Sequence, residues 1–235
     1  MKRFWDVATA VADADGWSVQ LDGKPVRVPG GGLLRLPNAV LAREVAAEWQ
    51  AAGGAKGGEM SYDDLPLTRL AGTAQERVSA DPGPVVLEIA RYGQADLLCY
   101  RAEAPATLVQ RQVEQWQPWL DWASSELAAP LIVTTGITHI TQTDATLAAL
   151  TLAVARQDPH RLAALGILVP SYGSLVLGLA VAHGAVSATE AHEIATLDER
   201  HQAEFWGWDH EAETRMARMA EDIAAAGRFL DLCAA

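Results

Sequence analysis

The sequence predicts an α+β protein in which a small β-rich N-terminal domain with one helix precedes a larger all-helical domain. Apolar and polar residues alternate with the period of a strand in the first forty residues, whereas the helical period dominates beyond Leu65. The chain has 235 residues, of which 50% are hydrophobic, so each domain can bury a core. We expect the domains to span residues 1–60 and 61–235, with the boundary near a glycine-rich loop.

The N-terminal domain is predicted to contain a meander of strands followed by a helix. Asp22-Gly23 is a hairpin signal between two alternating segments. Asn38 is a favourable N-cap, and the apolar residues that follow at four-residue spacing predict a helix that ends near Gly53-Gly54. The predicted strands are residues 17–21, 25–28 and 33–36.

The second domain is expected to consist of amphipathic helices. Pro118 lies inside one of them and is expected to kink or split it. Residues 131–142 are rich in β-branched side chains and predict an extended segment, which pairs either with itself or with the N-terminal sheet. The predicted helices are residues 66–80, 83–98, 106–127, 144–156, 158–168, 173–185, 188–205 and 209–232.

Composition and charge exclude several classes of function. Lys and Arg number 18 against 30 Asp and Glu, a net charge of −12, which disfavours binding to nucleic acid and to anionic lipid surfaces. The uncharged stretch 162–189 is interrupted around Pro170, so we expect two buried segments rather than a transmembrane hairpin. The two cysteines, Cys99 and Cys233, and an N-terminus without signal or transit character indicate a cytoplasmic protein.

The motifs of common catalytic, cofactor and metal sites have no match in the sequence. There is no phosphate-binding glycine loop, so no specific nucleotide is expected. There is no Cys-x-x-Cys pair for structural zinc. Four late histidines lie nine residues apart, so neighbours on a helix face opposite sides, and we interpret them as ordinary surface residues. They are His183, His192, His201 and His210.

The acidic C-terminal quarter contains the candidate binding residues. Between Thr189 and Asp222 lie ten acidic residues against three arginines. A solvated helix face is the simplest interpretation, but residues 205–211 also place aromatic side chains among the acids, which is an interface composition. We therefore expect partner contacts from Glu204, Trp206, Asp209 and Glu211.

Several strings of residues resemble, in the same order, those of one known family. The chain resembles, over essentially its whole length, the ATP synthase F(1)-sector assembly chaperones that act on the alpha subunit in mitochondria and alphaproteobacteria. The matching strings are Leu21-Asp-Gly-Lys-Pro-Val-Arg27, Ala47-Glu-Trp49, Leu65-Pro-Leu-Thr-Arg-Leu-Ala-Gly-Thr-Ala74, Asp96-Leu-Leu-Cys-Tyr-Arg-Ala102 and Glu204-Phe-Trp-Gly207.

The resemblance implies a chaperone rather than an enzyme, with no cofactor. It implies that the chain binds free alpha subunit, shields its assembly interface and is displaced by the beta subunit, in a bacterial cytoplasm or, for eukaryotic relatives, the mitochondrial matrix. Nucleotide-site interfaces carry Arg and Lys for phosphate, so acids on the chaperone have the complementary sign. Two alternatives stay open: an enzyme with a pocket near Arg69, Tyr100 and Arg101, and a membrane-associated protein that uses residues 162–185.

Overall fold

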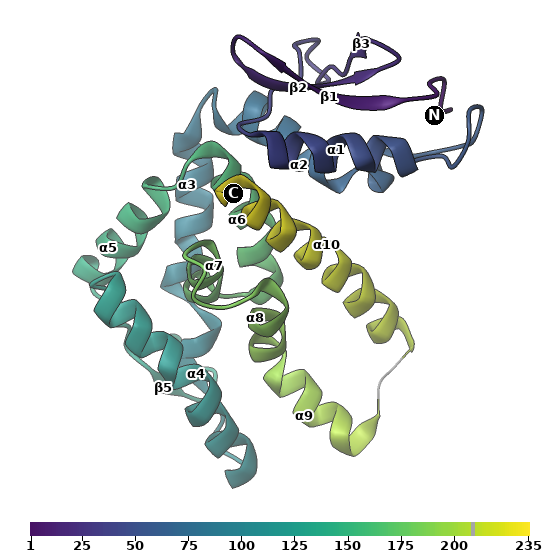
Figure 1. Cartoon of the computed structure of the whole chain (residues 1–235). Coiled ribbons are helices and arrows are strands. Elements are labelled where there is room, and N and C mark those ends of the chain that lie inside the picture. Colours follow the sequence, from purple (N-terminus) through teal and green to yellow (C-terminus); the bar gives the residue numbers. More distant parts are fainter. Residues whose placement is uncertain (208–209) are drawn as a thin grey trace. The chain divides into compact units, whose positions relative to one another are not determined.

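The computed structural model describes residues 1–207 and 210–235, without the side chains of Trp206, His210, Glu211 and Ala212 (Figure 1). Short strands near the N-terminus and a larger helical part confirm the predicted α+β class. The chain divides into two compact units, and helices α6 (Pro159–Tyr172) and α10 (His210–Ala234) contribute residues to both. Unit 1 is Met1–Pro82, Asp158–Ala164 and Arg228–Ala235, and unit 2 is Gly83–Gln157 and Leu165–Gly227.

Unit 1 begins with an antiparallel sheet in the order β1 (Ala8–Asp13), β2 (Gly16–Leu21), β3 (Lys24–Pro25). The predicted strand at 17–21 is confirmed as β2, and the hairpin at Asp22-Gly23 joins it to β3. No separate strand was predicted at the position of β1. The segments expected as the next strands contribute β3 and isolated bridges, which pair Arg27 with Leu33 and Trp17 with Leu36.

Helix α1 (Ala39–Ala51) packs against this sheet (Figure 1). As predicted, Asn38 is its N-cap, because the Asn38 side chain accepts a hydrogen bond from the Leu41 amide at 2.8 Å. The predicted apolar stripe of Leu41, Val45 and Trp49 is buried. The amphipathic pattern therefore identified both the start and the buried face of this helix.

Glu48 links α1 to helix α2 (Pro66–Thr73) inside unit 1. Its carboxylate accepts hydrogen bonds from the backbone amides of Leu67 at 2.6 Å and Thr68 at 3.0 Å. The Thr68 hydroxyl in turn accepts a hydrogen bond from the Trp49 indole at 3.0 Å. Two of the strings that carry the family resemblance thus hold two helices together. The 3-10 helix η1 (Tyr62–Asp64) precedes α2, and a π-helical turn, η2 (Ala74–Val78), follows it.

Unit 2 is mostly helical, with α7 (Leu175–Ala182) at its centre: every residue of α7 is buried, and α4 and α8 contact it. Two short parallel strands, β4 (Tyr100–Arg101) and β5 (Thr134–Thr135), form its sheet. Its remaining helices are α3 (Pro82–Ala90), η3 (Arg91–Gln94), η4 (Leu97–Cys99), α4 (Ala106–Glu126), α5 (Asp144–Ala155), α8 (Ala188–Ala195) and α9 (Leu197–Trp206).

Several helix boundaries differ from the predicted ones. Helix α4 runs through Pro118 without a break because Trp116 and Leu120, on either side of it, are buried and hold the helix in place. Helix α6 likewise continues through Pro170 and ends at Gly173, whose φ of +63° suits glycine. The single helix expected at 188–205 is divided into α8 and α9 at Thr196.

Residues 131–142 form strand pairs neither with themselves nor with the N-terminal sheet, although the Gln142 side chain hydrogen-bonds to the backbone of Ile132. Thr134 pairs with Tyr100 and Thr135 with Arg101, so the extended segment was predicted correctly and both expected pairing partners were wrong. Among the described residues, no helix is long and apolar enough to cross a membrane. The uncharged stretch 162–189 instead supplies much of the core, in α6 and α7.

Candidate partner-binding site

The four predicted contact residues lie at the end of α9 and the start of α10. Glu204 is on α9, and its exposed side chain has defined contacts. Trp206 is the last residue of α9 and Glu211 belongs to α10, but both side chains lie outside the described part of the structure, and Asp209 lies outside it altogether. The structure therefore tests the surroundings of Glu204 alone.

Helix α9 starts and stops for identifiable reasons. Leu197 is buried at its start. Asp198 and Glu199 lie in its first turn, where the helix dipole stabilises negative charge. Gly207 ends the helix with a φ of +73° and donates its backbone N–H to the Ala203 carbonyl at 2.9 Å. A glycine with positive φ is a common helix terminator, so the Glu204–Gly207 string fixes where α9 ends.

Glu204 is already engaged within the chain. Its carboxylate accepts a hydrogen bond from Nη1 of Arg111, on α4, at 2.7 Å. This hydrogen bond lowers the pKa of Glu204 and raises that of Arg111. Glu204 is therefore an ionised side chain paired with α4 on the exposed surface of α9.

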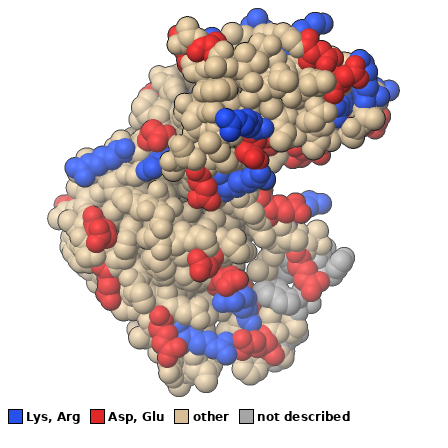
Figure 2. Space-filling view, viewed as in Figure 1, with Lys and Arg blue, Asp and Glu red and all other residues tan. Residues whose placement is uncertain are grey.

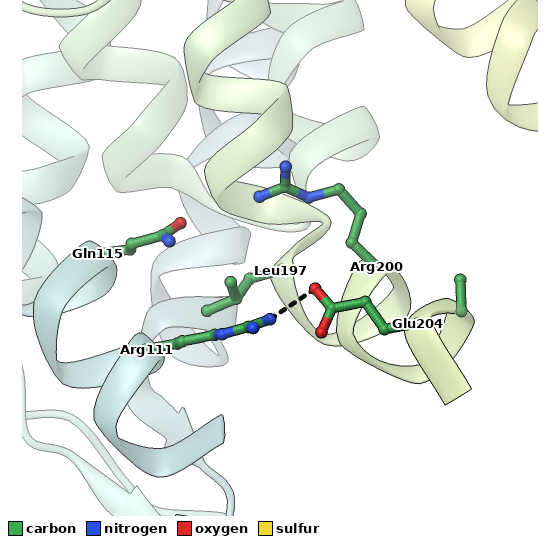
Figure 3. A pocket seen from close by; sticks show the side chains of 6 residues that line it. Arg111, Gln115, Leu197, Arg200 and Glu204 are labelled. Carbon is green, nitrogen blue, oxygen red and sulfur yellow. Dashed lines mark hydrogen bonds and ion pairs between the residues drawn. The ribbon is translucent and has the colours of Figure 1, made fainter. Parts of the chain in front are cut away.

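A pocket of about 490 Å³ lies between α4 and α9, both in unit 2 (Figure 3). Arg111 and Gln115 enter it from α4, while Arg200 and Glu204 enter it from α9, on one face of that helix. Nη2 of Arg200 donates to the Glu193 carbonyl at 3.0 Å. We call this hollow the α4–α9 pocket; its lining is Arg111, Gln115, Leu197, Arg200, Ala203 and Glu204.

Buried hydrogen bonds join α4 to both α8 and α9. The Gln112 side chain, which is 1% exposed, donates to the Asp198 carboxylate at 2.8 Å and accepts from the Ala102 amide at 2.8 Å. The Trp116 indole donates to the Ile194 carbonyl at 2.9 Å. These hydrogen bonds hold α8 and α9 against α4.

A second hollow, the α9–α10 groove, has a volume of about 640 Å³ and lies within unit 2. Its lining includes Tyr172 together with Met216 and Met219, which are half-buried, and the charged residues Glu199 and Arg215. Met216 and Met219 lie on the same apolar stripe of α10 as Ile223, Ala226 and Leu230. Ile223 and the residues beyond it on that stripe are buried, whereas the two methionines line the groove.

Sequence reasoning missed part of this surface. Phe205 is 68% exposed next to Glu204, although it lay inside the aromatic segment noted in the sequence. His201 is 5% exposed, with Nε2 3.4 Å from the Thr107 hydroxyl, so its interpretation as a surface residue was wrong. No local sequence pattern marks Arg111 and Arg200 as pocket residues, because the pocket is lined by two helices that are far apart in the sequence.

The residues proposed for an enzyme pocket have structural partners in this chain. Arg69 pairs with Asp63 at 3.0 Å. The guanidinium of Arg101 is buried and donates to the Leu98 carbonyl at 2.9 Å and the Gln112 carbonyl at 2.6 Å. The described residues contain no cluster of His, Cys, Asp and Glu suited to a metal ion.

Charge is mixed rather than segregated over the visible face. Figure 2 shows acidic and basic side chains interspersed on both units, despite the net charge of −12. At the end of α9 the exposed aromatic side chain of Phe205 follows Glu204, which lines the α4–α9 pocket together with Arg111 and Arg200. Such a mixture of aromatic and charged groups is typical of a protein-binding surface.

Comparisons with known proteins agree with this class. A family model described as ATP12 chaperone protein matches residues 2–124. The crystal structure of Atp12 from Paracoccus denitrificans is 42% identical, with a TM-score of 0.92 over 99% of this chain and 98% of that one. An Asp-to-Lys mutant of the same bacterium's Atp12p gives 41% identity and a TM-score of 0.92, covering 99% and 97%.

A third structure, a putative chaperone from Agrobacterium tumefaciens, is 36% identical, with a TM-score of 0.90 over 98% of this chain and 85% of that one. Fold, surface and relatives together define a chaperone. The chain belongs to the ATP12 chaperone family. This confirms the family that the sequence strings indicated, the chaperones of ATP synthase assembly.

Proposed function

We propose that this chain binds the free alpha subunit of ATP synthase and shields its assembly interface until the beta subunit replaces it. In this proposal it acts in the bacterial cytoplasm as a non-enzymatic binding protein, without nucleotide or cofactor. The observation that carries the proposal is the surface of α9, where Phe205 is 68% exposed beside the fixed carboxylate of Glu204. An exposed aromatic side chain next to ordered charges is a typical anchor for a protein partner.

The proposed contacts are the end of α9 and the first turn of α10. Phe205 supplies an apolar anchor, and Glu204 stays paired with Arg111, so it offers an ordered charge at little additional entropy cost. Trp206, Asp209 and Glu211 complete the surface that we propose. Basic groups of the alpha subunit that bind phosphate in the assembled enzyme are the complementary charges.

Charge reversal tests the acidic part of this surface. We expect the double variant Asp209→Lys, Glu211→Lys to bind purified alpha subunit at least about tenfold more weakly, because like charges then face each other. The matched control reverses Glu221 and Asp222, two exposed acids farther along α10. Glu190 is a poor control, since it forms a capping box with Ser187 at the start of α8.

Each outcome of this comparison decides something. A specific contact weakens binding mainly in the Asp209/Glu211 variant, whereas a general effect of net charge weakens both variants equally and fades with added salt. Unchanged binding by the Asp209/Glu211 variant would remove these two residues from the site. Phe205→Ser tests the apolar anchor in the same assay, and thermal melts of each variant show whether the fold is intact.

A further inference from the structure

The α4–α9 pocket contains more positive than negative charge, although the chain as a whole carries −12. Its charged lining residues are Arg111, Arg200 and Glu204. Nη1 of Arg111 lies 2.7 Å from the Glu204 carboxylate, and Arg200 also lies close enough to act electrostatically on that carboxylate. The carboxylate pairs with Arg111 alone, so the charge of Arg200 is left without an ion-pair partner among the lining residues and the pocket carries a net charge of about +1.

The guanidinium of Arg200 has hydrogen-bonding capacity that the described residues do not use. Its one hydrogen bond, among the described residues, runs from Nη2 to the Glu193 carbonyl at 3.0 Å. Its Nε is buried and has no acceptor in the described part of the chain. Nη1 also makes no hydrogen bond among the described residues, so the guanidinium keeps donors for a ligand in the pocket that it lines.

We propose that the α4–α9 pocket binds a carboxylate group of the partner protein, with Arg200 as its main ligand. A guanidinium binds a carboxylate through parallel N–H donors, and the Gln115 side chain, which also lines the pocket, supplies a further donor or acceptor (Figure 3). Glu204 positions Arg111 and stays in place. This inference rests on the proposed function, because the carboxylate belongs to the alpha subunit.

The inference changes what the partner must look like. Acids beyond Trp206 face basic groups in the proposed function, whereas the pocket on α9 faces an acidic one. An interface with both signs at fixed positions sets the register of the two proteins and rejects partners that carry only one sign.

The test uses the direction of a charge effect. If the partner surface were only basic, removing any arginine from this chain would leave binding unchanged or strengthen it, because the chain becomes more negative. If the pocket binds a carboxylate, removing Arg200 alone weakens binding. We expect Arg200→Gln to weaken binding of purified alpha subunit about tenfold, and Arg200→Lys to retain part of the affinity.

Arg218→Gln is the matched control, since Arg218 is an exposed arginine on α10 outside the lining of the pocket. Equal affinities for wild type, Arg200→Gln and Arg218→Gln would overturn the inference while leaving the proposed function intact. If the wild-type chain fails to bind alpha subunit at all, the proposed function itself fails. Thermal melts show whether Arg200→Gln weakens binding because it destabilises the fold. If Arg200→Gln does not fold, Arg200→Lys and Gln115→Leu replace it in the same assay.

The carboxylate has two possible sources, a side chain of Asp or Glu or the C-terminus of the alpha subunit. A second arm repeats the comparison with alpha subunit that lacks its last ten residues. If the difference between wild type and Arg200→Gln persists, the ligand is a side chain, and if it disappears, the ligand is the terminus. Either result supports a carboxylate in the pocket.

Discussion

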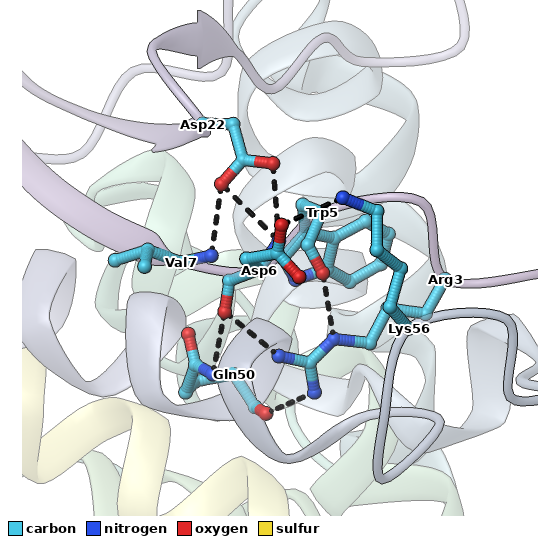
Figure 4. Close-up of polar contacts among 7 residues, drawn as sticks. All are labelled: Arg3, Trp5, Asp6, Val7, Asp22, Gln50 and Lys56. Carbon is cyan, nitrogen blue, oxygen red and sulfur yellow. Dashed lines mark hydrogen bonds and ion pairs between the residues drawn. The ribbon is translucent and has the colours of Figure 1, made fainter.

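Arg3 is a buried arginine that ties the N-terminus of the chain to the end of α1 (Figure 4). It is 4% exposed, and its guanidinium donates to the carbonyls of Trp5 at 3.1 Å, Gln50 at 2.7 Å and Gly54 at 2.7 Å. A cation at the C-terminal end of a helix also interacts favourably with the helix dipole. Arg3 therefore has a structural role, because its guanidinium satisfies these backbone carbonyls.

The variant Arg3→Met tests this role. We expect the free energy of unfolding to fall by about 3 kcal/mol, because several buried carbonyls lose a charged donor and no water replaces it. Urea denaturation measures the change. Lys56→Met is the control, since Lys56 is an exposed cation in the same cluster that pairs with Asp6, and it should leave the midpoint unchanged. Equal effects of both variants would contradict the structural role of Arg3.

His160 is expected to make unit 1 sensitive to acid. Burial lowers its pKa from 6.5, an effect that the nearby Asp158 carboxylate opposes. Its ring lies 6.0 Å from that of Phe229. Because the folded pKa lies below the unfolded one, the unfolded chain binds more protons below pH 6.5, and stability is lost as the pH falls from there through the folded pKa.

We predict that His160→Gln reduces the loss of stability between about pH 7.5 and 5.5, because this titration is then absent. Urea denaturation at the two pH values measures the loss. The control is His183→Gln, at an exposed position. If His160→Gln and the wild type lose the same free energy of unfolding over this pH range, another group causes the loss.

Asn38 acts on two helices at once, which makes it a test at the scale of elements. Its Oδ1 accepts from the Leu41 amide at 2.8 Å at the start of α1, and its Nδ2 donates to the Leu232 carbonyl at 2.8 Å near the end of α10. We expect Asn38→Ala to cost about 1–2 kcal/mol in urea denaturation. Asn38→Ser restores the cap but not the second bond, so it should recover only part of the loss. A serine variant no better than alanine would mean that capping contributes little.

Helices were predictable from periodicity, but their interruptions were not. The residues around Thr196 carry no Gly or Pro, yet α8 ends there. The break coincides with contacts far away in sequence, namely Trp116 to Ile194 and Gln112 to Asp198. Strand β5 shows the same limit, because its partner, β4, lies between the predicted helices 83–98 and 106–127, where no strand was predicted. Local patterns report local preferences, while these features depend on packing between helices.

The candidate site was predictable only in part. The acidic, aromatic composition pointed to Glu204 and its surroundings. The Arg111 partner is 93 residues away along the chain, on α4, and no spacing rule in the sequence links the two. Three of the strings that identified the family make structural contacts, as between Glu48 and Thr68 and between Asp96 and Ser174. Most of the strings that identified the family thus specify the fold, and the Glu204–Gly207 string alone lies in the proposed binding surface.

At the scale of the whole molecule, the boundary near residue 60 remains our prediction for the piece that folds by itself. We expect residues 1–60 to form the sheet and α1 in isolation, but less stably than residues 1–82. The shorter fragment lacks Thr68, so Trp49 and Glu48 lose their hydrogen-bond partners. Circular dichroism and urea denaturation of both fragments measure this. A random-coil spectrum for 1–60 together with a folded 1–82 would move the boundary beyond α2.

The last eight residues, Arg228–Ala235, belong to the same compact unit as the N-terminus. Phe229 is fully buried, Leu230 is nearly so, and Arg228 forms an ion pair with Glu44 on α1. Although they are farthest from Met1 in sequence, these side chains complete the core of unit 1. Deleting them leaves a cavity of more than one large side chain, and a buried Phe alone contributes about 3–5 kcal/mol.

We therefore predict that a chain ending at Gly227 loses at least about 4 kcal/mol, unfolds at a clearly lower temperature and exposes the aromatic residues of unit 1 to solvent. Differential scanning calorimetry and tryptophan fluorescence of Trp5 and Trp49, both buried in the intact chain, follow the change. Deleting only Ala234 and Ala235, which are exposed, is the control. If the chain that ends at Gly227 melts with the full-length protein, the C-terminal residues lie on unit 1 without stabilising it, and the first 82 residues with the start of α6 form a sufficient core.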